Sequence, residues 1–120
     1  MEVDNFNNSI RDLALRMVKC PGMLQGEAAI GLMLYQRKSH ELAPLIYIPD
    51  TDTMIWERGC GSGAATVGAY VAKKTGKDIH LEIRQPGGQT QVWARCRRGN
   101  ITSLEIQGHV DISAVGTAFV

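Results

Sequence analysis

One stretch of small and apolar residues constrains this fold more than any other part of the chain. Residues 64–74, AATVGAYVAKK, carry polar side chains mainly at their C-terminal end. A helix that is apolar on nearly every side must be buried along most of its length. Lys73 and Lys74 suit the negative end of the helix dipole, and Gly76 can supply the C-terminal cap. We therefore expect a central helix over 64–74, with the rest of the chain folded around it.

The remaining segments predict strands and one further helix. Strands are indicated by apolar runs or alternation over residues 28–35, 45–48, 53–57, 79–83, 91–97 and 101–106. The QPGG sequence at 85–88 has the type II pattern, and Gly99-Asn100 predicts a second hairpin turn. Residues 10–18 form an amphipathic helical pattern that Asn7, Asn8 or Ser9 can cap. We interpret residues 1–120 as one α+β domain whose mostly antiparallel sheet wraps around one buried helix.

Composition excludes several classes of partner. The 120 residues carry a formal net charge of +1, which argues against a nucleic-acid or membrane-surface partner held by a basic face. The short basic cluster Arg95, Arg97 and Arg98 is interpreted as solvated surface charge. No apolar run approaches the roughly 18 residues of a membrane helix, and the N-terminus is not a signal peptide.

The cysteines and histidines indicate free thiols rather than a metal site. The 3 cysteines are an odd number, and their spacing matches no zinc pattern, while the 3 histidines are scattered. We therefore expect a reduced, cytoplasmic protein that has neither a metal site nor a cofactor.

The turn before the central helix has two interpretations. The segment 55–63, IWERGCGSG, joins an apolar strand, an acidic residue and a G-x-G-x-G turn. It resembles the first motif of methyltransferases that use S-adenosylmethionine, in which small residues let the backbone approach the cofactor. The segments after the helix, however, predict an antiparallel meander, and too few residues follow for further βα units. The methyltransferase interpretation is therefore the alternative.

In the other interpretation, Cys60 is a reactive thiol at the start of the central helix. The free backbone N–H groups of Gly61, Ser62, Gly63 and Ala64 then point into the same space as its sulfur. These groups and the positive end of the helix dipole favour a thiolate. The same N–H groups can hold a carboxylate. A base beside a carboxylate seat suits an α-amino acid, whose carboxylate is one bond from Cα.

The motif around Cys60 resembles a known family. Glu57-Arg58-Gly59 followed by CGSGA at 60–64 is similar to the second catalytic motif of diaminopimelate epimerase and its relatives. These are amino-acid racemases and epimerases that work without pyridoxal phosphate, and the resemblance covers roughly residues 26–110. It implies that Cys60 is one of two cysteines that exchange the α-proton. It also implies that the amides of Gly61, Ser62 and Gly63 bind the α-carboxylate, while Glu57 and Arg58 hold polar groups of the substrate.

Two features refine this resemblance. Gly59 directly precedes Cys60, whereas diaminopimelate epimerases have a loop there, so the spacing is more like the branch that racemises other amino acids, including histidine. Family members consist of two similar halves, each contributing one cysteine, and this chain has the length of one half. The resemblance implies the C-terminal half, with residues 1–18 at the boundary between halves. A complementary N-terminal half, or a second copy of the chain, would then face Cys60.

The other two cysteines are not expected to be the second thiol. Cys20 lacks a glycine-rich helix start, and Cys96 alternates with Val92 and Ala94 as a buried small residue would. The leading hypothesis is thus half of a cofactor-independent racemase or epimerase. The other hypotheses are a methyltransferase-like domain and a non-catalytic domain that binds an amino acid or another anion.

Overall fold

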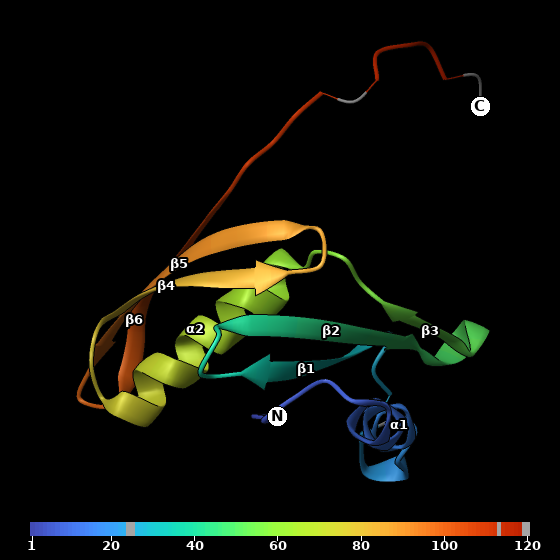
Figure 1. The fold of residues 1–120 in the computed structure, drawn as a ribbon, viewed down its shortest axis with the longest axis horizontal. Helices are drawn as coiled ribbons and strands as arrows, with labels where there is room; N and C mark the ends of the chain where they lie inside the picture. Colours follow the sequence, from blue (N-terminus) through green and yellow to red (C-terminus); the bar gives the residue numbers. More distant parts are fainter. Residues whose placement is uncertain (24–25, 113, 119–120) are drawn as a thin grey trace.

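Helix α2 (Gly61–Thr75) is the element around which the sheet folds in the computed structural model, which describes residues 1–23, 26–112 and 114–118 (Figure 1). It packs against strands β1, β4, β5 and β6. The other elements are α1 (Asn8–Met17), β1 (Ile30–Gln36), β2 (Glu41–Ile48), β3 (Thr53–Trp56), β4 (Ile79–Gln85), β5 (Gly88–Arg97) and β6 (Asn100–Gly108), with short 3₁₀ turns at Pro21–Met23 and Pro49–Thr51.

The strands form one curled sheet in the order β1-β2-β4-β5-β6, and β3 pairs with the C-terminal part of β2. All pairs are antiparallel except β2 and β4, which meet in parallel at Glu41 and Arg84. The predicted α+β class with a mostly antiparallel sheet is confirmed. The finer prediction of a diaminopimelate epimerase-like half-domain stays a prediction.

Small residues allow α2 to lie close to the sheet. Its buried face consists of Gly63, Ala64, Val67, Gly68, Val71 and Ala72. A Cβ atom on Gly68 would lie 2.3 Å from Cγ1 of Val92, a fully buried side chain of β5. The opposite face is open, and Tyr70 is 44% exposed. The helix is therefore covered on one face, less completely than its composition predicted.

Helix α1 covers a second apolar cluster on the other part of the sheet. Asn7 caps it, because its side chain accepts the N–H of Ile10 at 3.0 Å. Ala14 and Val18 are fully buried and pack with residues of β1 and β2 such as Leu45. The helix thus contributes to the core of this chain, and its suggested position at a boundary between halves stays a prediction.

Both hairpin turns differ from their predictions. In the β4–β5 turn the residue with positive φ is Gly88, at 147°, and not Gly87, so the turn is not type II. The physical reason is that the Gly87 N–H turns toward the carbonyl of Arg58. The β5–β6 turn is Arg98-Gly99, one residue earlier than predicted, and both residues have positive φ as in type I′ turns.

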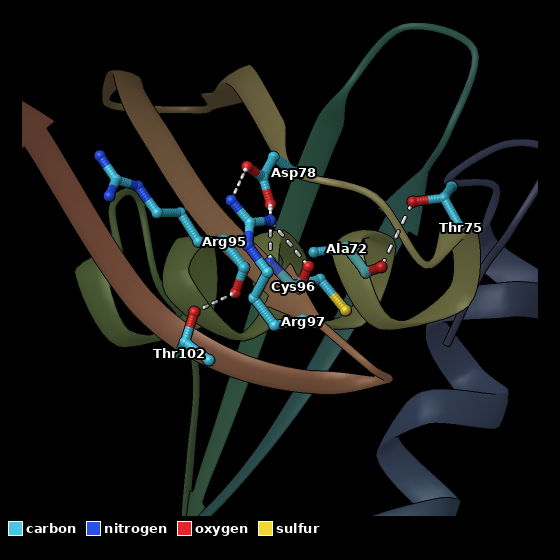
Figure 2. A network of polar contacts seen from close by, with 7 residues as sticks. All are labelled: Ala72, Thr75, Asp78, Arg95, Cys96, Arg97 and Thr102. Atoms are coloured by element: carbon cyan, nitrogen blue, oxygen red, sulfur yellow. Dashed lines mark hydrogen bonds and ion pairs between the residues drawn. The ribbon is translucent and has the colours of Figure 1, made fainter.

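Figure 2 shows that the basic cluster is partly structural. Asp78 accepts the N–H of Cys96 at 2.9 Å, where a β-bulge at Arg95 and Cys96 interrupts the pairing with β6. Both carboxylate oxygens also accept the Arg97 guanidinium, at 2.5 and 3.0 Å. All three arginines are exposed, as the prediction of surface charge requires, but Arg97 is in addition paired with Asp78. The Arg97 guanidinium, and secondarily the Cys96 N–H, lower the pKa of Asp78.

Among the described residues, no helix combines the length and the apolar character that crossing a membrane would require.

Gly68→Ala should destabilise the domain, because the new methyl group overlaps Val92. Overpacking costs about 1–3 kcal/mol and the gain in helix propensity is about 1 kcal/mol, so we expect a net loss of up to about 2 kcal/mol. Urea unfolding followed by circular dichroism measures it. Adding Val92→Ala as a second change provides room for the methyl group. A double variant whose loss of stability equals the sum of the two single losses would contradict this explanation.

Asp78→Asn should lower the melting temperature at neutral pH and have little effect in acid. The folded-state pKa of Asp78 lies below its unfolded value of about 3.9, so its contribution to stability is present above that pH. This contribution is lost as the pH falls through the folded-state value. Melting curves of both proteins between pH 7 and 3 check this, and a difference that stays constant over that range would contradict it.

Candidate active site

Cys60 is the N-terminal cap of α2 and lies in extended backbone, with φ −139° and ψ 105°. Its Sγ accepts the backbone N–H of Gly63 at 3.4 Å and lies 3.4 Å from the Ser62 hydroxyl oxygen. The Cys60 carbonyl accepts the N–H of Ala64 at 3.0 Å, which is the first bond of the helix. The predicted position of the sulfur at the helix start is confirmed, although α2 begins at Gly61 rather than Ala64.

The four amides predicted to form a carboxylate seat divide into two pairs. The N–H groups of Gly63 and Ala64 are bonded to Cys60 itself. The N–H groups of Gly61 and Ser62 donate to no other group in the part of the chain that the structure describes. The capacity to bind an anion is thus concentrated in the first two amides of the helix, where the dipole is most positive.

Cys60 is half-buried and borders an open hollow of about 490 Å³. The lining is rich in glycine and amide side chains: Gly59, Cys60, Gly61, Gln85, Gly87, Gly88, Gln89, Thr90, Gly108, His109 and Asp111. A space of this size can hold a small polar molecule such as an amino acid.

Glu57 and Arg58 come just before the lining residue Gly59 in the sequence, but they do not line the hollow themselves. Glu57 is half-buried, and its backbone N–H donates to the carbonyl of Pro44 at 2.9 Å. Arg58 is exposed, and its guanidinium donates to the carbonyl of Pro86 at 3.5 Å. Their predicted contacts with a substrate stay predictions, as does the binding role of Gly61, Ser62 and Gly63.

Gln85 is a residue of this site that the sequence analysis missed. Its side-chain oxygen accepts the Cys60 N–H at 2.8 Å, and its side-chain nitrogen donates to the Cys60 carbonyl at 3.4 Å. Twenty-five positions separate the two residues, and only the return of β4 alongside the helix start brings them together. The sequence offers no signal for this contact beyond the position of Gln85 before the hairpin turn.

The other two cysteines lie elsewhere in the fold. Cys96 is buried with Ala72 and Ala94. Ala72 lies twelve positions along the helix from Cys60, which is roughly 18 Å at 1.5 Å per residue. Cys20 is exposed after α1, and its Sγ lies 3.6 Å from the carbonyl of Arg16. Neither borders the hollow described above, as expected.

Comparison with known proteins assigns a family. A family model described as histidine racemase CntK N-terminal domain matches residues 1–119. A histidine racemase of Staphylococcus aureus is 40% identical over 96 residues, which cover 76% of this chain and 34% of that protein. One of Fusobacterium nucleatum subsp. nucleatum is 27% identical over 93 residues, which cover 78% of this chain and 33% of that protein. The chain thus spans about a third of the length of these curated relatives.

The matched model describes an N-terminal domain, so the assignment to a C-terminal half is wrong. The reason lies in the resemblance itself, which implies two similar halves that each carry a cysteine at a glycine-rich helix start. A motif that both halves share cannot distinguish between them. The wider likeness to diaminopimelate epimerase stays a prediction.

Gly63→Ala should displace the Cys60 sulfur, because a Cβ atom there would lie 3.2 Å from Sγ and 2.6 Å from Sδ of Met33. Losing the hydrogen bond to Sγ, worth about 1 kcal/mol, should slow alkylation of Cys60 by iodoacetamide about fivefold. The rate is measured by peptide mass spectrometry with Cys20→Ser in all proteins. Adding Met33→Ala relieves the contact with Met33 only, so recovery of the full rate in that double variant would contradict the explanation.

Proposed function

This chain belongs to the histidine racemase N-terminal domain family, and we propose that it forms part of an amino-acid racemase in which Cys60 exchanges the α-proton. We propose histidine as the first substrate to test, because the similar curated proteins are described as histidine racemases. The reaction is proposed to need no pyridoxal phosphate, because two thiol groups can move the proton between the faces of Cα.

The proposed chemistry is one proton transfer on each face of Cα. A thiolate on one face takes the α-proton, and the C–H electron pair stays on Cα. A thiol on the other face then donates its proton to Cα, which inverts the configuration and leaves that sulfur as the thiolate. Each turnover therefore exchanges the protonation states of the two sulfur atoms, and no proton is gained or lost overall.

The observation that carries this proposal is the position of the Cys60 sulfur. It accepts the Gly63 N–H at the mouth of α2 and borders the hollow. The Gly63 N–H and the positive end of the helix dipole both face this sulfur. A substrate carboxylate on the N–H groups of Gly61 and Ser62 would bring its Cα close to this sulfur, because only one bond separates the two carbons.

We propose that the second thiol comes from outside this chain. Cys20 and Cys96 lie away from the hollow, and the curated relatives are about three times as long as the part matched here. A complementary C-terminal part of the enzyme is the favoured source. Two copies of the chain with facing Cys60 side chains are the other arrangement, which size-exclusion chromatography of the active species would distinguish.

Glu57 and Arg58 are proposed to act on parts of the substrate that extend beyond the hollow. Arg58 is exposed and makes a single long hydrogen bond to Pro86, so most of its N–H donors are free to turn toward a ligand. Glu57 is half-buried at the end of the segment that leads into Cys60.

The methyltransferase-like alternative fits the topology less well. The strands after α2 form an antiparallel meander, β4-β5-β6, instead of the alternating strands and helices of a parallel nucleotide-binding sheet. A non-catalytic anion-binding domain would use the same two amides. It differs from the racemase in having no exchange of the α-proton.

The test is incorporation of solvent deuterium at Cα of L- and D-histidine by the full-length enzyme that contains this chain. Mass spectrometry follows the label, and diaminopimelate serves as a comparison substrate. We expect exchange with histidine and a loss on the order of 100-fold or more in Cys60→Ala. Cys20→Ser is the matched control and should retain activity, because its thiol is exposed at the end of α1.

Exchange that persists in Cys60→Ala would remove Cys60 from the mechanism. Absence of exchange in the unmodified enzyme, with histidine still bound in calorimetry, would favour the non-catalytic binding domain.

A further inference from the structure

We propose that Gln85 is a positioning residue, whose side-chain amide holds the Cys60 peptide so that the sulfur stays at the helix mouth. This inference deepens the proposed function and rests on it. The Gln85 side chain forms hydrogen bonds to both the N–H and the carbonyl of Cys60, and it lines the same hollow as Cys60.

The two contacts use complementary groups. The Gln85 side-chain oxygen accepts from Cys60 N–H, and its NH₂ group donates to the Cys60 carbonyl. An amide is the side chain that can do both at once, because it has an acceptor and donors on neighbouring atoms. The Cys60 N–H is partly buried and has no other hydrogen-bond acceptor among the described residues, so losing Gln85 would leave it unsatisfied, which is unfavourable.

The turn that follows Gln85 strengthens this attachment. The Gly87 N–H donates to the Arg58 carbonyl at 2.5 Å. A Cβ atom on Gly87 would lie 2.8 Å from that same oxygen, so glycine is needed for this approach. The Arg58 guanidinium returns a bond to Pro86. The β4–β5 turn is therefore bonded to both Arg58 and Cys60, and it fixes the path of the chain into the helix.

Hydrogen bonds at the end of β4 hold the backbone of Gln85 in place. It is the last residue of β4 and pairs with Gly88 of β5. The preceding residue, Arg84, donates its backbone N–H to His40 at 2.9 Å and its guanidinium to Ser39 at 2.6 and 3.2 Å. These bonds attach the end of β4 to the β1–β2 hairpin, so the side chain of Gln85 starts from a fixed point.

Two consequences follow for the sulfur. Because the N–H and the carbonyl of Cys60 are both held, the main freedom of its side chain is rotation about the Cα–Cβ bond. The Gly63 N–H then favours the rotamer in which the sulfur caps the helix. The holding group is also neutral, so it places no negative charge beside a thiolate. A glutamate there could accept the Cys60 N–H, but its second oxygen would face the Cys60 carbonyl oxygen and its charge would oppose the thiolate.

The experiment compares Gln85→Met, which keeps the shape without the hydrogen bonds, with Gln85→Glu, which keeps one bond and adds a charge. Gln89→Met and Gln89→Glu are matched controls, because Gln89 borders the same hollow and makes no hydrogen bond to Cys60. Iodoacetamide alkylation of Cys60 is measured from pH 5 to 10 with Cys20→Ser in every protein. Melting curves confirm that each variant folds.

We expect Gln85→Met to slow alkylation at pH 7 about tenfold, and Gln85→Glu to raise the pH at which alkylation becomes fast, because its charge opposes the thiolate. The Gln89 variants should change both quantities much less. In the full-length enzyme, Gln85→Met should lower kcat for histidine and change KM little, because the carboxylate seat at Gly61 and Ser62 is intact.

Folded Gln85→Glu with the unmodified rate and pH profile would overturn the inference, whether or not Gln85→Met folds. An enzyme that shows no α-proton exchange, but whose Cys60 alkylation depends on Gln85, would overturn the proposed function and leave the positioning role standing. If the Gln85→Met enzyme exchanges the α-proton as fast as the unmodified enzyme, the positioning role is overturned and the proposed function stands.

Discussion

The close contact between α2 and β5 is the constraint on which the remaining structure depends. Gly68 has no side chain where Val92 occupies the space, so the helix can lie directly against the sheet. That contact fixes the direction of α2, and with it the location of the helix mouth. The curled sheet then has to follow, because β4, β5 and β6 all pack on this one helix. The site at Cys60 is thus a consequence of how the core packs at a distance from it.

At the helix mouth, hydrogen bonds turn a packed core into a defined chemical environment. The carbonyl and the sulfur of Cys60 accept N–H groups of the first turn of α2, and the Cys60 N–H donates to the side chain of Gln85. Among the described residues, the N–H groups of Gly61 and Ser62 have no hydrogen-bond acceptor, and Gly61 lines the hollow. The proposed base and the proposed anion seat would both follow from this capping geometry, without any residue that has an unusual side chain.

In the proposed racemase, a division of the enzyme into parts would account for a domain that carries one of the two thiol groups. Racemisation needs groups on both faces of Cα, whereas the described residues place one thiol at the hollow. The curated relatives extend well beyond the matched part, which is consistent with a second contributor. A motif shared between similar halves, which the resemblance implies, also explains why local sequence indicated a racemase family but not which part of the enzyme this chain matches.

The sequence by itself determined most of the elements and the position of Cys60. The small and apolar residues of 64–74 required a packed helix, apolar spacing and alternation predicted β4, β5 and β6, and the glycines around Cys60 placed it at a helix start, because all these signals are local. Tertiary structure alone decided the rest: Gln85 on Cys60, Asp78 on Arg97, and the conformation of the β4–β5 turn. These are contacts between residues distant in sequence or shaped by such neighbours, and no local periodicity or turn preference encodes which partner the folded sheet brings within bonding distance.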